Sequence, residues 1–237
     1  MGRVLCITGT GTEAGKTAVS LSVLLWAKKA GIRAAYVKLV QCGSRLPKPE
    51  PFMGDAEWIT AADPALEAAA LYSFPDPVSP HLASEKTGAW IDPDWMMERV
   101  EESTHRSDLL VIEGAGGVAT PFSRNGFSLA EAASKGQWPC LLVCPTGLGA
   151  LSHGRTAAQY LESRGAALAG FAMSQATPDL PAVYSDNVET LTSLLPAHYF
   201  GLVPYCPGLN KRLPLPPAMA LLFSRALTGL GPWWHGP

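Results

Sequence analysis

The sequence carries little charge and no large excess of either sign. Lys and Arg number 18 and Asp and Glu number 20, which gives a formal net charge of -2. Nucleic-acid-binding chains are usually basic overall or along one face, so this composition disfavours that class. Long apolar runs are also missing, because none approaches the about 18 residues that a membrane-spanning helix needs. Neither a nucleic acid nor a membrane is therefore an expected partner.

Cysteine is sparse as well. The five cysteines lack the spacing of a metal site or a disulfide framework. Three of them, Cys6, Cys140 and Cys144, lie in apolar runs and are expected to be small core residues. This usage fits a reducing cytoplasm, and the first apolar run begins so early that we expect no signal peptide. No low-complexity linker or charge block divides the chain, so we expect one α/β domain over residues 1–230 and a poorly ordered tail over 231–237, in which Trp233 and Trp234 could still dock on the domain.

Apolar runs of strand length alternate with segments of helical length. Strands are expected at residues 4–7, 33–40, 108–113, 140–144, 167–173 and 198–203. Helices are expected at residues 18–27, 56–62, 63–71, 92–105, 129–134, 152–163 and 181–195, with a last helix ending near 227. Proline-rich loops are expected at 46–51 and 73–84. This alternation predicts a mainly parallel sheet with helices on both faces, in which ligands gather at the carboxyl ends of the strands.

The clearest motif is Gly9-Thr10-Gly11-Thr12-Glu13-Ala14-Gly15-Lys16-Thr17. It follows the first expected strand and opens the first expected helix, which is the context that a phosphate-binding loop requires. Its glycines let backbone N–H groups surround phosphate oxygens, Lys16 adds a positive charge, and the Thr17 hydroxyl can hold Mg²⁺. The usual loop has four residues between its glycines, whereas five separate Gly9 from Gly15. The motif still predicts the fold of P-loop nucleoside triphosphate hydrolases.

Three charged side chains are expected near this loop. Glu113 ends a buried strand, Lys38 lies near the end of another, and Asp55 precedes a helix. We expect Glu113 to give Mg²⁺ an oxygen ligand, although a strand-end carboxylate can also be solvated or cap a turn. Asp55, judged by spacing, could simply be a helix N-cap. Lys38 could extend to solvent or neutralise a substrate anion beside the phosphates, and the residues alone leave this open.

From Val4 to about Pro204 the chain resembles the dethiobiotin synthetases of biotin biosynthesis. Several stretches carry the resemblance, and their order and spacing are more specific than any one of them. They are Gly9–Thr17 with its extra loop residue, Val37–Gly43, Gly54–Ala56, Val78–Ala83, and Val111–Gly117 with Pro121. Gly201–Pro204 also resembles the family's segment before the base pocket.

The resemblance implies a homodimeric cyclo-ligase that uses ATP and Mg²⁺ to make dethiobiotin from 7,8-diaminopelargonic acid and CO₂. In that family CO₂ adds to one amine, and the resulting carbamate takes the γ-phosphoryl group of ATP. The second amine then attacks the carbonyl of the carbamic–phosphoric anhydride, closes the ureido ring and expels phosphate. Positioning and charge neutralisation should dominate such a phosphoryl transfer.

The resemblance also assigns roles to residues. Lys16 would bridge the phosphates and the carbamate, and Lys38 would neutralise the carbamate, so these are the expected catalytic residues. The expected metal ligands are Thr17, Asp55 and Glu113. The expected nucleotide-binding residues are Gly11, Thr12, Glu13, Ala14, Gly15, Lys16, Thr17, Asp55, Glu113, Gly114, Ala115, Gly116, Ser174 and Pro204. The expected substrate-binding residues are Thr12, Lys38, Cys42, Gly149, Ala150, Leu151 and Ser152, the last four across the dimer interface.

The chain departs from the family pattern at three positions. Gly11 stands where the family usually has Asp, Cys42 where Ser is common, and Ser174 where an Asn usually reads the purine. A serine hydroxyl cannot offer the paired donor and acceptor of an amide. We therefore expect weak discrimination among nucleoside triphosphates.

Other functions compete with this interpretation. Partitioning and cell-division ATPases have a similar sheet and loop, but they carry an extra lysine early in the loop, where this chain has Thr10. Amide-forming ligases of corrin precursors usually add a glutaminase domain, for which 237 residues leave little room. A non-catalytic paralogue is also compatible with Gly11 and Ser174.

Overall fold

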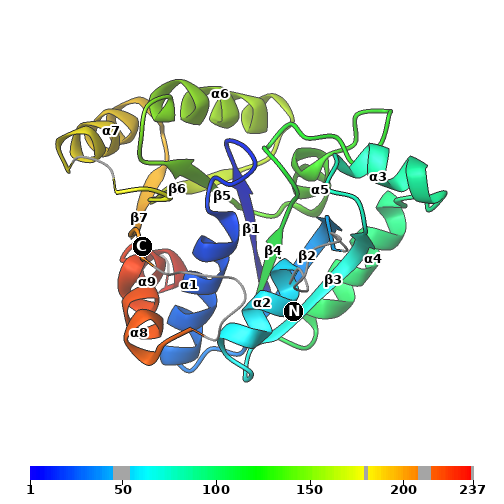
Figure 1. Ribbon diagram of the computed structural model, residues 1–237, viewed down its shortest axis with the longest axis horizontal. Helices are drawn as coiled ribbons and strands as arrows, with labels where there is room; N and C mark the ends of the chain where they lie inside the picture. The colour runs from blue at the N-terminus through cyan, green and yellow to red at the C-terminus, as the bar shows by residue number, and fades with distance from the viewer. Residues whose placement is uncertain (45–53, 179–180, 208–214, 236–237) are drawn as a thin grey trace.

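The computed structural model describes residues 1–44, 54–178, 181–207 and 215–235. Within these residues seven strands form one sheet in the order β3-β2-β4-β1-β5-β6-β7, and every neighbouring pair is parallel. The strands are β1 (Arg3–Gly9), β2 (Ala34–Cys42), β3 (Glu67–Phe74), β4 (Leu109–Glu113), β5 (Cys140–Pro145), β6 (Leu168–Ser174) and β7 (His198–Val203). The predicted parallel α/β sheet is confirmed (Figure 1).

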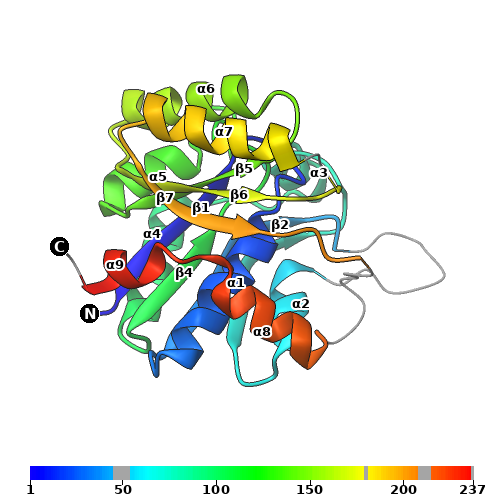
Figure 2. The ribbon, with the colours of Figure 1, turned by 90° about the vertical axis from the view of Figure 1, so that its left-hand side faces the viewer.

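Helices cover both faces of this sheet, as Figure 2 shows edge-on. One face packs against α1 (Lys16–Lys29), α2 (Asp55–Ala62), α8 (Pro217–Ala226) and α9 (Leu230–His235). The other packs against α3 (Pro80–Thr87), α4 (Pro93–Thr104), α5 (Leu129–Gly136), α6 (Ala150–Ser163) and α7 (Pro181–Leu194). No helix among the described residues is long and apolar enough to cross a membrane.

The central strands read as continuous apolar runs because both of their faces are buried. Along β4, Leu110 and Ile112 join the core under α4 and α5, while Leu109 and Val111 join the core under α1. Successive strand residues point to opposite faces, so a strand between two helical layers needs an apolar side chain at every position. Glu113 breaks this run at the carboxyl end of β4, and it is fully buried.

Two of the expected local structures are wrong. Residues 63–71, expected as a helix, contain most of the edge strand β3, which pairs in parallel with β2 from Ala35 opposite Glu67 to Cys42 opposite Phe74. The segment is rich in alanine, which favours a helix, but pairing with β2 decides its structure. The expected loop at 73–84 includes the start of α3, with Pro80 at its first turn. The proline-rich loop expected at 46–51 lies outside the described residues.

The expected poorly ordered tail is also wrong for residues 231–235. They belong to α9, which packs back on the sheet face that carries α1. Trp234 contacts Trp26 of α1 edge-on, with ring centroids 6.4 Å apart, and the Arg3 guanidinium lies over the Trp234 ring. Aromatic packing of this kind buries apolar area that a solvated tail would expose.

The strand order places three carboxyl ends side by side. β1 lies between β4 and β5, and β4 in turn pairs with β2. The register sets Glu113 opposite Ile7 on one side and opposite Lys38 on the other. The phosphate-binding motif after β1, the lysine of β2 and the carboxylate of β4 therefore meet at one edge of the sheet.

Candidate functional site

The glycine-rich motif forms a tight connection between β1 and α1. Gly15 has φ 93°, Glu13 has φ 63°, and α1 begins at Lys16. A Cβ at Gly15 would overlap the side chain of Ser174 at the end of β6, so this position needs glycine for space as well as for its backbone conformation. The Lys16 Nζ donates to the Gly11 carbonyl at 2.8 Å. The loop thus presents a helix N-terminus and an ammonium group together, as phosphate binding requires.

A cavity of about 830 Å³ opens beside this loop. Its volume is within the range of sites that hold a nucleotide or another small molecule. Expected site residues that line it are Thr12, Glu13, Gly15, Lys16, Thr17, Lys38, Cys42, Asp55, Glu113, Ala115 and Gly116. Residues just before α3, including Val78 and Ser79, form another part of the cavity wall.

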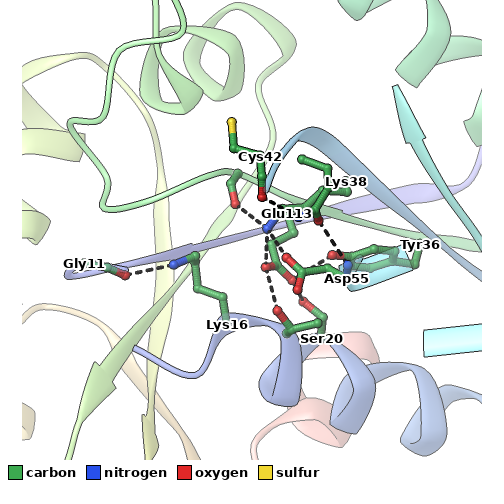
Figure 3. Close-up of polar contacts among 11 residues, drawn as sticks. Gly11, Lys16, Ser20, Tyr36, Lys38, Cys42, Asp55 and Glu113 are labelled. Carbon is green, nitrogen blue, oxygen red and sulfur yellow. Dashed lines mark hydrogen bonds and ion pairs between the residues drawn. The ribbon is translucent and has the colours of Figure 1, made fainter. Parts of the chain in front are cut away.

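Lys38 lies at the centre of the charged groups (Figure 3). Its Nζ is 2.7 Å from Asp55 Oδ2 and 2.7 Å from Glu113 Oε1, and it donates to the Gly114 carbonyl at 2.9 Å. The lysine and both carboxylates are buried. Lys38 therefore does not extend to solvent, and its neutralisation of a substrate anion stays a prediction.

Glu113 accepts hydrogen bonds at both of its oxygens. Oε1 faces Lys38 and the Thr17 hydroxyl, the latter at 3.1 Å. Oε2 accepts from the Ser20 hydroxyl at 2.7 Å and from the Tyr36 hydroxyl at 3.0 Å. With an exposed fraction of 0%, this carboxylate depends entirely on these donors to offset its lost hydration.

The protonation of the neighbouring groups follows from burial and charge. Burial by itself would lower the pKa of Lys38, but the Glu113 and Asp55 carboxylates outweigh it and raise the pKa above its ordinary value. Burial, then Glu113 and Asp55, raise the pKa of Tyr36. Burial raises the pKa of Cys42 to about 11, although Lys38 opposes this. At neutral pH the site holds an ammonium, a neutral phenol and a neutral thiol.

The oxygen groups that could hold a divalent cation are a hydroxyl and two carboxylates. Thr17, Asp55 and Glu113 all line the cavity, and the hydrogen bond from Thr17 to Glu113 brings two of these groups together. Hydroxyl and carboxylate oxygens, completed by water and phosphate, match the preference of Mg²⁺. The described residues contain no cluster of three His, Cys, Asp or Glu side chains suited to a metal. The donor set fits Mg²⁺ held jointly with a nucleotide better than a closed structural metal site.

Some expected site residues do not line this cavity. Ser174 lies behind Gly15, and Pro204 follows β7. Residues 149–152 begin α6 after β5, outside the cavity wall. Gly11 and Gly114 do not line the cavity, but their carbonyl oxygens accept hydrogen bonds from Lys16 and Lys38, respectively. Ala14 is buried within the loop. Their roles toward nucleotide and substrate remain predictions.

Three residues that were not predicted from the sequence also contribute to the site, namely Ser20, Tyr36 and Gln41. Ser20 and Tyr36 bind Glu113, and the Gln41 side-chain oxygen accepts from the Asp55 backbone N–H at 3.0 Å. The spacing of Ser20 and Tyr36 in the sequence could have indicated that they face the site. Ser20 lies one helical turn after Lys16 and Thr17, and Tyr36 lies two residues before Lys38 on the same face of β2.

Comparison with known proteins shows the family of this chain. A family model described as an AAA domain matches residues 3–212. An ATP-dependent dethiobiotin synthetase of Geobacillus kaustophilus is 33% identical over 215 residues, which cover 90% of this chain and 89% of the relative. The enzyme of the same name from Escherichia coli K12 is 32% identical over 203 residues, which cover 84% of this chain and 89% of the relative.

Solved structures show where the fold belongs. The MinD cell division protein of Aquifex aeolicus superposes with a TM-score of 0.58 at 15% identity, covering 94% of each chain. The MinD cell division ATPase of Pyrococcus furiosus gives a TM-score of 0.54 at 16% identity, covering 94% of this chain and 97% of that chain. At such identity the likeness concerns the fold alone. The parallel sheet, the loop, the buried charges and the extended sequence identity together show that the chain belongs to the dethiobiotin synthetase family.

Proposed function

We propose that this protein is an ATP-dependent dethiobiotin synthetase that closes a ureido ring from 7,8-diaminopelargonic acid and CO₂. One observation carries the proposal: Lys16 and Lys38 line the same cavity, and Lys38 is held by two buried carboxylates beside the phosphate-binding loop. The reaction brings an anionic carbamate against a triphosphate, so it needs two cations at that position. The names of the relatives support the same activity.

The proposed chemistry divides among the residues of the cavity. One amine of the substrate attacks CO₂ and loses a proton, which gives the carbamate whose oxygen then takes the γ-phosphoryl group while ADP leaves. Lys16 would neutralise the phosphates and Lys38 the carbamate. The second amine attacks the carbamoyl carbon, loses its proton and expels phosphate. Because the bonds form between bound partners, the residues contribute position and charge more than proton transfer.

The proposed cofactor is Mg²⁺, held by Thr17, Asp55 and Glu113. When bound, it would neutralise the negative charge that develops on the phosphate oxygens. The oxygen donor set of the cavity supports this assignment.

The family resemblance adds a homodimer and a role for residues 149–152. These residues begin α6, whose N-terminus provides backbone N–H groups that suit a carboxylate. We propose that they bind the substrate's carboxylate tail from the neighbouring subunit.

All five cysteines are free, which supports a cytoplasmic location.

A single incubation separates the competing functions. The protein is mixed with the diamine, bicarbonate, Mg²⁺ and ATP, and dethiobiotin and phosphate are measured together. We expect both products in equal amounts and almost no phosphate without the diamine. Phosphate release that ignores the diamine would instead favour an ATPase switch, and absence of both products would favour a non-catalytic paralogue.

Base selectivity gives a second expected result. Ser174 is buried at the end of β6, and its hydroxyl donates and accepts at one atom, so it cannot match the separate donor and acceptor of an amide and is expected to add about one hydrogen bond of modest net value with a base. We therefore expect kcat/KM for ATP and CTP to agree within about fivefold, since one neutral hydrogen bond contributes about 1 kcal/mol. Diamine-dependent turnover measured with each nucleotide tests this, with Ser174→Ala as the control. A hundredfold preference for ATP would contradict it.

A further inference from the structure

The two carboxylate oxygens best placed for a divalent cation are in contact with a different cation in this structure. Asp55 Oδ2 and Glu113 Oε1 each lie 2.7 Å from Lys38 Nζ. A divalent ion would bind these oxygens at about 2.1 Å, which brings it within a few ångströms of the ammonium. Like charges at such a distance repel strongly in a buried site. The ion and the Lys38 ammonium therefore compete for the same position.

The protein fixes the Glu113 carboxylate and the backbone of Asp55 more firmly than the lysine ammonium. Glu113 cannot turn away, because Ser20 and Tyr36 bind its other oxygen from α1 and β2. Asp55 starts α2, and its backbone N–H is bound by the Gln41 side chain. Lys38, by contrast, carries its ammonium on a flexible four-carbon stem along the cavity wall. The lysine is the partner that can move.

We propose that Lys38 has two positions, and that arrival of the metal ion moves it from one to the other. Without metal, its ammonium lies between the Asp55 and Glu113 carboxylates and offsets their negative charge. With metal, the ion takes over that pair, and the ammonium turns into the cavity to meet an anionic group of the substrate. The identity of that anion as a carbamate rests on the proposed function; the exchange itself does not.

This exchange couples metal binding to substrate binding. A lysine held by two carboxylates is a poor partner for a substrate anion, because its charge is already compensated. Once the ion compensates the carboxylates, the ammonium becomes available at the place where the phosphoryl acceptor has to lie. The site would thus become cationic only when the metal is present.

The first test compares two variants that lose the same charge. Lys38→Met removes the competing ammonium, whereas Lys28→Met removes a lysine that pairs with Asp63 at 2.5 Å near the surface. Binding of Mn²⁺ alone is measured from the electron paramagnetic resonance signal of the free ion. We expect Lys38→Met to bind Mn²⁺ at least roughly tenfold more tightly than the unmodified protein, because a like charge has been removed from the site. Lys28→Met should bind it unchanged. Equal or weaker binding by Lys38→Met would overturn the proposal.

The second test measures the metal-free protein. Lys38→Met should lower the melting temperature by about 5 °C or more, since it leaves two buried carboxylates without their cation. Adding Asp55→Asn to Lys38→Met should recover at least half of that loss. If the single variant does not fold, folding of the double variant supports the proposal. A double variant that is no more stable than the single one overturns it.

Both tests are independent of the ligase reaction. The samples contain no diamine, bicarbonate or nucleotide, so the exchange can fail in a protein that still makes dethiobiotin. It can equally hold in a protein that does not, and the two proposals are therefore distinguished.

Discussion

Replacement of Lys38 by methionine is expected to reduce dethiobiotin formation by about a hundredfold to a thousandfold while nucleotide still binds. The size of the effect follows from the proposed role of the ammonium, which would be one of two cations that stabilise negative charge between carbamate and phosphate. Such a group lowers the activation barrier by about 3–4 kcal/mol. Methionine keeps most of the side-chain length and removes the charge. The loop that would bind the phosphates is left intact, because Lys38 lies on β2 and not within it.

The measurement separates binding from chemistry. The affinity for ATP is measured by equilibrium binding, and kcat is measured from dethiobiotin formed at saturating diamine, bicarbonate and Mg²⁺. Lys28→Met serves as the matched control, because it removes a lysine–aspartate pair on the surface of the same protein. A Lys38→Met variant that retains a tenth of the activity would show that this lysine does not act on the reacting groups.

Replacement of Glu113 by glutamine is expected to impair both stability and activity. The carboxylate is fully buried and accepts from Thr17, Ser20, Tyr36 and Lys38. A glutamine has only one acceptor oxygen, so its amide nitrogen must face one pair of these donors. The hydroxyls of Ser20 and Tyr36 can turn to accept, but an ammonium cannot. The oxygen of glutamine would therefore stay toward Lys38. Because glutamine is uncharged, the charge-assisted hydrogen bonds that Glu113 accepts at both of its oxygens would be lost.

We expect this change to cost about 2–3 kcal/mol in the free energy of unfolding, because hydrogen bonds to a charged group are worth roughly twice neutral ones. Activity should fall by about a thousandfold if Glu113 holds the metal ion. Urea unfolding and the dethiobiotin assay test the two parts separately. The matched control is Tyr36→Phe, which removes one donor to the same carboxylate and should cost about 1 kcal/mol. If Glu113→Gln is as stable as the unmodified protein, the hydrogen-bonded cluster around Glu113 does not stabilise the fold.

Local sequence patterns were sufficient to predict the elements that surround the site. The loop motif, the buried strands around it and the ends of β2 and β4 could be predicted because each depends on residues close in sequence. The same local patterns failed for residues 67–74, since an alanine-rich segment becomes a strand only when β2 is present to pair with it. They also failed for 231–235, whose aromatic side chains pack on α1 and on Phe200 of β7.

The residue pattern was enough to predict that the phosphate-binding loop, Lys38 and Glu113 lie at one edge of a parallel sheet, whereas Asp55 was expected in the site only from the family resemblance. How these groups are paired depends on the fold. Lys38 lies between Asp55 and Glu113, and Ser20 and Tyr36 bind the far oxygen of Glu113. Ser20 and Glu113 are 93 residues apart, and Lys38 and Glu113 are 75 apart. The physical reason is that hydrogen bonds and ion pairs depend on ångström distances set by strand register and helix packing, which no local periodicity encodes.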